Sequence, residues 1–491
     1  MAQAGTLTFT EGQTNQTITV VVLDDALVEG DESFFVQMFN PGSGTVISGL
    51  TNVQVNLIDE EFGPGSLDRN FDPGLGANDI VRSLSVQADG RILAGGAFTT
   101  FGGSTNRFVT RLAANGTNDP TFNTASGPNG LVTAVAAAAD QRVVAVGGFT
   151  LVNGVPYNQV VRFKTNGVTD ATFDDDAGFN GSVNIMNLQS DGRVLLGGAF
   201  GLPTRGLVRL RLDGTVDTAF IPGSGLNGPV YSITVQTDQR VLVGGTFTTA
   251  DGATATRVAR FHTDGSLDGS FAVTAITNGT VYCMVLQSNG QLVIGGDFRT
   301  TSSMNSVRLA RLNTDGSLDG TFNVGIGANG VVFALGVNSS NQIVVGGDFT
   351  TVNGTNRNRF ARLHSDGTLD VGFDPGPGAN GTVYTVAILS NDDILIGGNF
   401  TTVNGALRNR VAKILGGGIA FSPVASAAAS GGLIHLRFSA QAGKTYRLES
   451  SANLLVWEAV STKAANSATV EWTQTVVQGA GPRFYRVRVM P

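Results

Sequence analysis

Residues 346–354 read GGDFTTVNG and residues 397–405 read GGNFTTVNG, so a glycine-rich loop beside a polar residue recurs 51 residues later. Such a loop could hold a phosphate on its backbone N–H groups, and Asp348 could ligate a metal ion. However, no Lys-Ser or Lys-Thr follows the glycines and no helical pattern begins there, which argues against a phosphate site. In seven copies the next residue is Ala, Gly, Ala, Thr, Asp, Asp and Asn, and a shared metal ligand would not vary in this way. The phrase is therefore predicted to be structural.

Other residues that could perform catalysis are few. The loop after Phe173 carries three adjacent acids, Asp174–Asp176, and paired carboxylates can hydrolyse glycosidic bonds. Adjacent acids on one loop nevertheless fit solvated groups or weak cation binding better. The three His residues match no metalloprotease spacing, and no nucleophile-elbow motif occurs. The single cysteine, Cys283, lies in the apolar run VYCMV and is predicted to be a buried thiol. We therefore expect no enzymatic activity.

An asparagine precedes each of seven similar strand-like segments, and in six of them a glycine follows it. One interpretation is a turn that requires a positive φ angle. The other is a ring of amides around one mouth of a channel, which could hydrogen-bond a polar or sugar ligand. The candidate ligand-binding residues are Asn78, Asn129, Asn180, Asn227, Asn278, Asn329 and Asn380.

Composition limits the classes of function. Only 14% of the 491 residues are charged and 67 are glycine, which is typical of many short strands joined by tight turns. The net charge of −7 and the absence of a Lys/Arg-rich run argue against a nucleic-acid partner. No apolar run is long enough for a transmembrane segment, and the start MAQAGTLTFTEGQ shows no signal peptide. We expect the N-terminus to be truncated relative to a longer chain.

A repeat close to 50 residues organises the chain. Aligned on the phenylalanine of the opening phrase, seven copies are spaced by 51, 51, 47, 51, 51 and 51 residues. Each copy holds three strand-like runs bounded by Asn-Gly or Asp-Gly turns and a short fourth run such as SLDGTF. Four antiparallel strands in seven periods predict an all-β, seven-bladed β-propeller. A right-handed β-helix fits less well, because its coils are shorter.

The two ends of the repeat array predict how the ring closes. The first xLDxxF unit, GSLDRNF, precedes any GGxF phrase, so the N-terminal segment should supply the outer strand of the last blade. In six copies a third-strand arginine is followed eight residues later by an aspartate, close enough to pair across a hairpin. Asp68 has no such partner upstream and Lys413 has none downstream. We predict that these two residues pair across the closure, within about 10 Å.

The motifs GSLDxxF, NGxV, QxDGRxLxGGxFT and xNGxxRxxxARLxxDG resemble the delta-60 repeat, a bacterial β-propeller family, over residues 64–415. The resemblance implies a propeller in a large secreted or surface protein. It implies no particular activity.

Residues 1–62 are similar to the C-terminal half of a Calx-beta domain, a β-sandwich that in some members binds calcium. The resemblance implies a possible calcium site in the segments LDDALVEGDE and LIDEE, since clustered carboxylates suit this hard cation. Solvated acidic loops are the alternative. The matching residues are Asp24, Asp25, Glu29, Glu32, Asp59, Glu60 and Glu61.

The C-terminal part begins with a linker at residues 417–432, after the propeller at 63–416. Residues 433–491 contain short alternating runs and predict a small β-sandwich, similar to C-terminal modules of secreted planctomycete and verrucomicrobial proteins. Its tryptophans, Trp457 and Trp472, could stack on sugars or fill the core.

These features predict a non-enzymatic extracellular or cell-surface scaffold for adhesion or recognition, with a protein or glycan partner. We expect a monomeric propeller within a longer chain. No cofactor is predicted with certainty, and calcium in the Calx-beta-like segment is the one candidate. A lectin-like propeller is the alternative, and a polysaccharide-degrading enzyme is the third hypothesis.

Overall fold

The computed structural model describes residues 63–173, 177–301 and 307–417, the single residues 8 and 11, and the strands that lie outside these ranges. Every regular element in this described part is a β-strand. None of it contains a helix long and apolar enough to cross a membrane. The described part of the chain is therefore all-β, as predicted.

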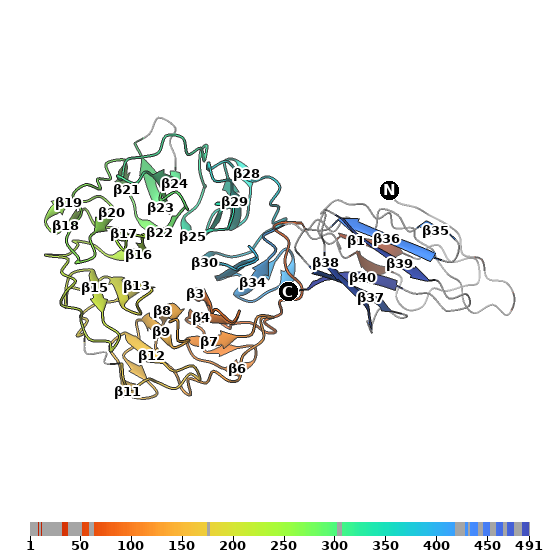
Figure 1. The fold of residues 1–491 in the computed structure, drawn as a ribbon, viewed down its shortest axis with the longest axis horizontal. Coiled ribbons are helices and arrows are strands. Elements are labelled where there is room, and N and C mark those ends of the chain that lie inside the picture. The colour runs from red at the N-terminus through yellow and green to blue at the C-terminus, as the bar shows by residue number, and fades with distance from the viewer. Residues whose placement is uncertain are drawn as a thin grey trace. The chain divides into compact units, whose positions relative to one another are not determined.

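Seven blades form a ring, as predicted (Figure 1). Each blade is an antiparallel sheet with three main strands, and the sheet of blade 5 contains one further short strand. The innermost strands are β3 (Val81–Val86), β8 (Val132–Ala137), β13 (Val183–Leu188), β16 (Val230–Val235), β22 (Val281–Leu286), β25 (Val332–Val337) and β30 (Val383–Ile388). The second strands are β4 (Ile92–Gly96), β9 (Val143–Gly147), β14 (Val194–Gly198), β17 (Val241–Gly245), β23 (Leu292–Thr300), β26 (Ile343–Gly347) and β31 (Ile394–Gly398). The third strands are β7 (Val109–Leu112), β12 (Val160–Phe163), β15 (Leu207–Leu210), β20 (Val258–Phe261), β24 (Val307–Leu312), β29 (Phe360–Leu363) and β34 (Val411–Ile414).

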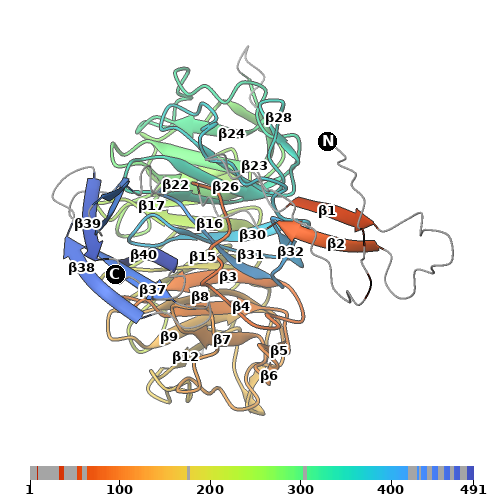
Figure 2. The ribbon, with the colours of Figure 1, turned by 90° about the vertical axis from the view of Figure 1, so that its right-hand side faces the viewer.

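Each innermost strand contacts the innermost strands of both neighbouring blades, and β3 contacts β30, so the ring is closed. Seen from the side, these strands run across the thickness of the ring (Figure 2). Each strand therefore ends on one of two faces. We call the face where the innermost strands begin the upper face, and the opposite one the lower face.

The fourth strand of each blade is shorter than predicted. It is reduced to one isolated bridge, such as Leu112 with Asn118 in blade 1. The chain leaves the sheet at the next residue, because the Asp119 carboxylate accepts a hydrogen bond from the Thr121 N–H and closes a tight turn. The conserved shape of this turn in every blade follows from the repeated aspartate.

Ring closure follows the prediction. Leu67, from the start of the array, forms the outer bridge with Ile414 of blade 7. The Asp68 N–H donates to the Lys413 carbonyl at 2.8 Å, and the Lys413 Nζ lies 2.9 Å from the Asp68 carboxylate. The last blade is therefore completed by the first residues of the array, which removes a free sheet edge.

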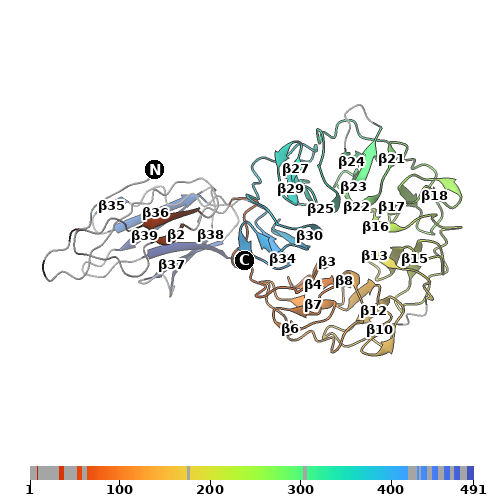
Figure 3. The ribbon, with the colours of Figure 1, turned by 180° about the vertical axis from the view of Figure 1, so that it is seen from behind.

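Short ribbons follow the second strand in several blades and lie on the outer rim (Figure 3). They are β5 (Thr100–Phe101) with β6 (Ser104–Thr105), β10 (Leu151–Val152) with β11 (Val155–Pro156), β18 (Thr249–Ala250) with β19 (Ala253–Thr254), β27 (Thr351–Val352) with β28 (Thr355–Asn356), and β32 (Thr402–Val403) with β33 (Ala406–Leu407). Blade 5 instead pairs β21 (Ile276–Asn278) with its long second strand. Blade 3, whose loop is four residues shorter, has no such ribbon among its described residues.

The opening phrase is structural, as predicted. Phe349 is fully buried in a cluster that joins side chains of blades 5 and 6. A side chain at Gly346 would have its Cβ 2.7 Å from Val383 of the next blade, so the glycine permits close packing of blades. Asn353 and Gly354 both have positive φ angles, which suits a two-residue hairpin turn.

Outside the propeller, β1 (Glu32–Gln37) and β2 (Asn52–Leu57) form an antiparallel pair. In the C-terminal part, β35 (Ala428–Ser430), β36 (Leu433–Ser439) and β39 (Thr469–Thr475) form one sheet. A second sheet contains β37 (Thr445–Ser451), β38 (Glu458–Ala464) and β40 (Phe484–Met490). Trp472 is buried, with the Lys463 Nζ 5.8 Å from its ring, so this tryptophan is a core residue, while Trp457 lies outside the described residues.

Candidate functional site

The seven candidate asparagines lie exposed at the upper face, three residues before each innermost strand. Their side-chain amide oxygens accept hydrogen bonds from backbone N–H groups of the same blade. The Asn329 Oδ1 accepts hydrogen bonds from the N–H groups of Thr350 and Thr351, and its Nδ2 donates to the Thr350 hydroxyl. None of the seven is among the described residues with positive φ, so that explanation was wrong. The asparagines fasten the loop after the second strand, and ligand binding by them stays a prediction.

The candidate calcium ligands Asp24, Asp25, Glu29, Asp59, Glu60 and Glu61 lie outside the described residues. The backbone of Glu32 pairs with Leu57, but its side chain is also outside the described part. Asp174–Asp176 are outside it as well. The described residues contain no cluster of three or more His, Cys, Asp or Glu side chains that could hold a metal ion.

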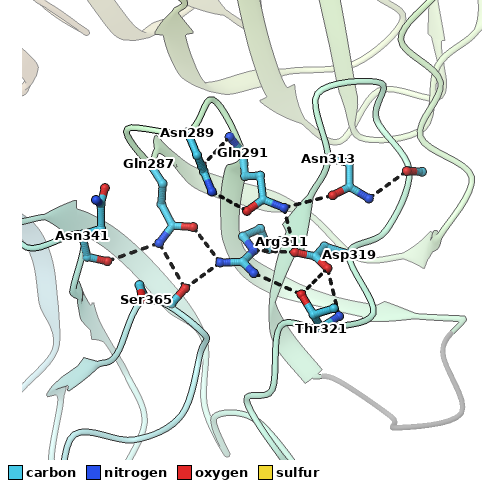
Figure 4. A network of polar contacts seen from close by, with 10 residues as sticks. Gln287, Asn289, Gln291, Arg311, Asn313, Asp319, Thr321, Asn341 and Ser365 are labelled. Carbon is cyan, nitrogen blue, oxygen red and sulfur yellow. Dashed lines mark hydrogen bonds and ion pairs between the residues drawn. The ribbon is translucent and has the colours of Figure 1, made fainter.

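A ring of buried ion pairs lies toward the lower face. In six blades the third-strand arginine places its Nε 2.7–2.8 Å from the carboxylate of the aspartate eight residues later. In blade 5 the Arg311 guanidinium also donates to the Ser365 carbonyl of blade 6 at 2.6 Å and to Thr321 (Figure 4). The guanidinium carbon of Arg311, Cζ, lies 4.8 Å from the centre of the Phe322 ring. The arginines therefore link neighbouring blades, as structural residues do.

The side chains around the Arg311 pair line a pocket of about 360 Å³ between blades 5 and 6. Gln291 donates to Asp319 at 2.8 Å, in the place where blades 1–4 have a second arginine (Figure 4). Blade 7 reverses this pattern, because Lys413 lies between Asp68 and Asp393, with the Asp393 carboxylate 3.3 Å from Nζ. Glutamine and arginine are thus interchangeable at this position.

Burial and ion pairing shift the pKa values of the buried aspartates in opposite directions. Burial alone would raise the pKa of Asp268, but hydrogen bonds from Ser270 and the ion pair with Arg260 lower the pKa to about 2. The same causes hold the pKa of Asp319 below its ordinary value. Burial raises the pKa of the Cys283 thiol, as predicted for a core cysteine and not for a nucleophile.

The upper face has a feature that does not repeat in all seven blades. Four aromatic rings, each on the second residue of an innermost strand, follow one another around blades 4–7: Tyr231, Tyr282, Phe333 and Tyr384. Successive ring centres are 5.2–5.3 Å apart and the planes are tilted by 50–56°. The Arg82 guanidinium of blade 1 continues the row at 4.0 Å from the Tyr384 ring. We call these five residues the aromatic half-ring.

The aromatic half-ring is not required to build a blade. Blades 2 and 3 have Thr133 and Asn184 at the same position. The Thr133 hydroxyl donates to the carbonyls of Val146 and Val183, and the Asn184 amide donates to Val230. A small polar residue therefore suffices to join neighbouring blades here. The half-buried aromatic rings of blades 4–7 are additional.

Sequence reasoning missed this half-ring because it searched for carboxylates, histidines and motifs. The signal was present in the aligned repeats, where the residue after the first valine reads Arg, Thr, Asn, Tyr, Tyr, Phe and Tyr. The 47-residue spacing marked a break of the repeat in blade 3, but it did not indicate these positions.

The seven repeats match the model of a β-propeller family described as a domain of unknown function, DUF5122, at residues 87–122, 138–173, 189–220, 236–271, 287–322, 339–373 and 389–418. The propeller of this chain belongs to that family. Residues 1–61 match the Calx-beta domain. Both resemblances inferred from the sequence are thereby confirmed, since the DUF5122 propeller is of the delta-60 repeat type.

No curated protein sequence matches the chain. Among solved structures, a gluconolactonase from Xanthomonas campestris is 14% identical, with a TM-score of 0.35 and coverage of 58% of this chain and 91% of that one. An exo-β-1,3-galactanase from Phanerochaete chrysosporium is 9% identical, with a TM-score of 0.29 and coverage of 87% and 96%. Similarities at this level carry no argument about function.

Proposed function

We propose that this DUF5122 propeller is a non-enzymatic recognition module of an extracellular or cell-surface scaffold, and that the aromatic half-ring is its binding surface. One observation carries the proposal. Four blades place half-buried aromatic rings in an unbroken row at one face, while other blades join their neighbours at the same position without them. Because the blades can be built without this row, its presence in only four of the seven blades makes the upper face asymmetric.

The chemistry of the row favours the lectin-like form of recognition. Aromatic rings bury much area at low entropic cost, and their faces suit the apolar faces of sugar rings. Several successive rings fit an extended ligand better than a single small molecule. Adhesion through a glycan is therefore the specific function that we propose, with protein recognition as the broader class.

The experiment is binding of the full chain to a glycan array, compared with the double variant Tyr282→Thr and Phe333→Thr. Threonine occupies the same position in blade 2, so the variant keeps a residue that the blade accepts. We expect the wild-type chain to bind a subset of glycans and the variant to lose at least tenfold in affinity. Absence of binding to any glycan, or equal binding by the variant, would remove the proposal.

A separate experiment tests whether the protein lacks enzymatic activity. Incubation of the full chain with a bound glycan should release no new reducing ends. Release that disappears when Asp174–Asp176 are replaced by asparagine would instead support the polysaccharide-degrading alternative. Calcium binding by the Calx-beta segment stays a separate prediction, checked by melting in millimolar calcium and in chelator.

A further inference from the structure

Unpaired positive charge accompanies the aromatic half-ring. Blades 4–7 have an arginine at the start of the third strand. It immediately precedes the strand in blades 4, 6 and 7 and is the second residue of the strand in blade 5: Arg257, Arg308, Arg359 and Arg410. Only Arg359 forms an ion pair with a described carboxylate, that of Asp348 at 2.7 Å. Arg82, within the half-ring, likewise has no ion pair among the described residues. The arginines of the lower face, in contrast, are paired with aspartates.

These arginines lie at the same end of the blades as the aromatic rings. In blade 4, the first residue of β16 pairs with Gly245, and the Gly245 N–H donates to the Arg257 carbonyl at 2.9 Å. The same pairing places Arg359 beside Gly347 in blade 6. An aromatic residue and an arginine therefore recur at the same end of each blade from blade 4 to blade 7.

The guanidinium groups are held by neutral partners, so their charge is not neutralised. The Arg308 Nη1 donates to the Ala328 carbonyl of the next blade at 2.8 Å. The Arg410 Nη1 donates to the Phe400 carbonyl at 2.9 Å, and Arg257 donates to the carbonyls of Thr246 and Phe247. Backbone carbonyls orient a guanidinium but leave its net charge available to an anion.

The fold does not require arginine at this position. Blade 2 has Gln159 there, with a φ of 68°, and its side-chain oxygen accepts a hydrogen bond from the Val183 N–H at 2.9 Å. Blade 3 has Gly206, the residue best suited to a positive φ. The Nε atoms of Arg257, Arg308 and Arg410 are buried without a hydrogen-bond partner among the described residues, which is unfavourable. The hydrogen bonds within the blades therefore do not by themselves account for arginine at this position.

We propose that the half-ring and its arginines bind an acidic polysaccharide, a glycan whose sugar rings carry carboxylates. This inference rests on the proposed recognition function and adds the ligand class. Tyrosine and phenylalanine faces stack on the sugar rings, while guanidinium groups pair with the carboxylates along the chain. An acidic peptide offers the same carboxylates but no succession of flat, rigid rings to stack on the row of aromatics.

The test is native affinity electrophoresis of the full chain in gels that contain polygalacturonate, its methyl-esterified form or polyglutamate. Polygalacturonate should retard the chain, and the ester and polyglutamate should not. The triple variant Arg257→Gln, Arg308→Gln and Arg410→Gln should lose at least tenfold in affinity for polygalacturonate. Added salt should weaken the binding, because it screens exposed charges.

A matched control removes three arginines from the lower face: Arg91→Gln, Arg193→Gln and Arg240→Gln. Glutamine occupies this position naturally in blades 5 and 6, where it hydrogen-bonds the same aspartate at 2.8 and 3.0 Å. The control has the same change in net charge and should retain wild-type retardation. Equal loss in the control would mean that overall charge alone governs the interaction, which overturns the inference.

The remaining outcomes separate the ligand class from the proposed function. Equal retardation by the acid and its ester would overturn the acidic ligand and leave glycan recognition in place. Retardation by polyglutamate alone would overturn it in favour of an acidic peptide. If none of the three polymers retards a chain that still binds neutral glycans on the array, only the ligand class fails.

Discussion

Blades 1–3 and blades 4–7 are built on the same three strands, and each has a buried ion pair on the third strand, Arg–Asp in blades 1–6 and Lys413–Asp68 in blade 7. The upper ends of the two groups of blades nevertheless carry different side chains. Blade 2 joins its neighbour through Thr133 and Gln159, whereas blade 5 presents Tyr282 and Arg308 at these two positions. The comparison separates two kinds of residue. Those that recur in every blade build the ring, and those that differ between the two halves form the surface that we propose for binding.

Acid should destabilise the propeller more than any substitution, because it protonates the aspartates of several Arg–Asp pairs at once. The pKa values of Asp119, Asp170, Asp217, Asp268 and Asp319 are all lowered in the folded state. An unfolded aspartate titrates near about 3.9, so the unfolded state takes up protons first as pH falls below about 4. Stability should therefore be constant above this value and fall steeply toward pH 2. Urea unfolding between pH 5 and pH 2 tests this, and a flat profile would contradict it.

Breaking one repeated pair should have the next largest effect. Arg260→Met leaves the buried Asp268 carboxylate without its ion-pair partner and removes the guanidinium 4.7 Å from the Phe271 ring. The expected loss is about 3–5 kcal/mol in the free energy of unfolding. Arg240→Gln, which copies blades 5 and 6, should cost less than about 0.5 kcal/mol. Similar losses in the two variants would show that the repeated pair is not special.

A repeated asparagine should matter less, and only for stability. Asn329→Ala removes an acceptor for two backbone N–H groups and a donor to Thr350. Because the site is exposed and water can replace these partners, we expect a loss of about 1–2 kcal/mol. Glycan affinity should not change. A tenfold loss of affinity with unchanged melting would restore the asparagines as ligand-binding residues.

A single half-ring substitution should destabilise the fold less than the loss of a repeated ion pair. Tyr282→Thr gives blade 5 the residue of blade 2 and removes contacts with two half-buried rings. Each aromatic pair contributes about 0.5–1.5 kcal/mol, so the loss should be below that of Arg260→Met. Chemical unfolding of both variants in parallel measures the difference. A larger loss for Tyr282→Thr would mean that the half-ring is structural.

Repetition explains what the sequence could and could not predict. The fixed spacing predicted the number of blades, the buried Phe349 and the pairing of Asp68 with Lys413. These predictions were possible because residues that make the same contact in each blade recur at the same position of each repeat. The asparagines were misinterpreted as turn residues, since periodicity shows that a residue is required but not which atoms it bonds. The half-ring escaped because a row of side chains from different blades becomes a surface only after the ring has closed.

The most direct test of the account replaces the whole aromatic row with the residue of blade 2. The full chain carrying Tyr231→Thr, Tyr282→Thr, Phe333→Thr and Tyr384→Thr is assayed for cooperative unfolding and for retardation by polygalacturonate on the same preparation. We expect a folded propeller with one cooperative transition and no measurable retardation. A folded variant that is retarded as strongly as the wild-type chain would contradict the central claim that the side chains which vary between blades form the binding surface.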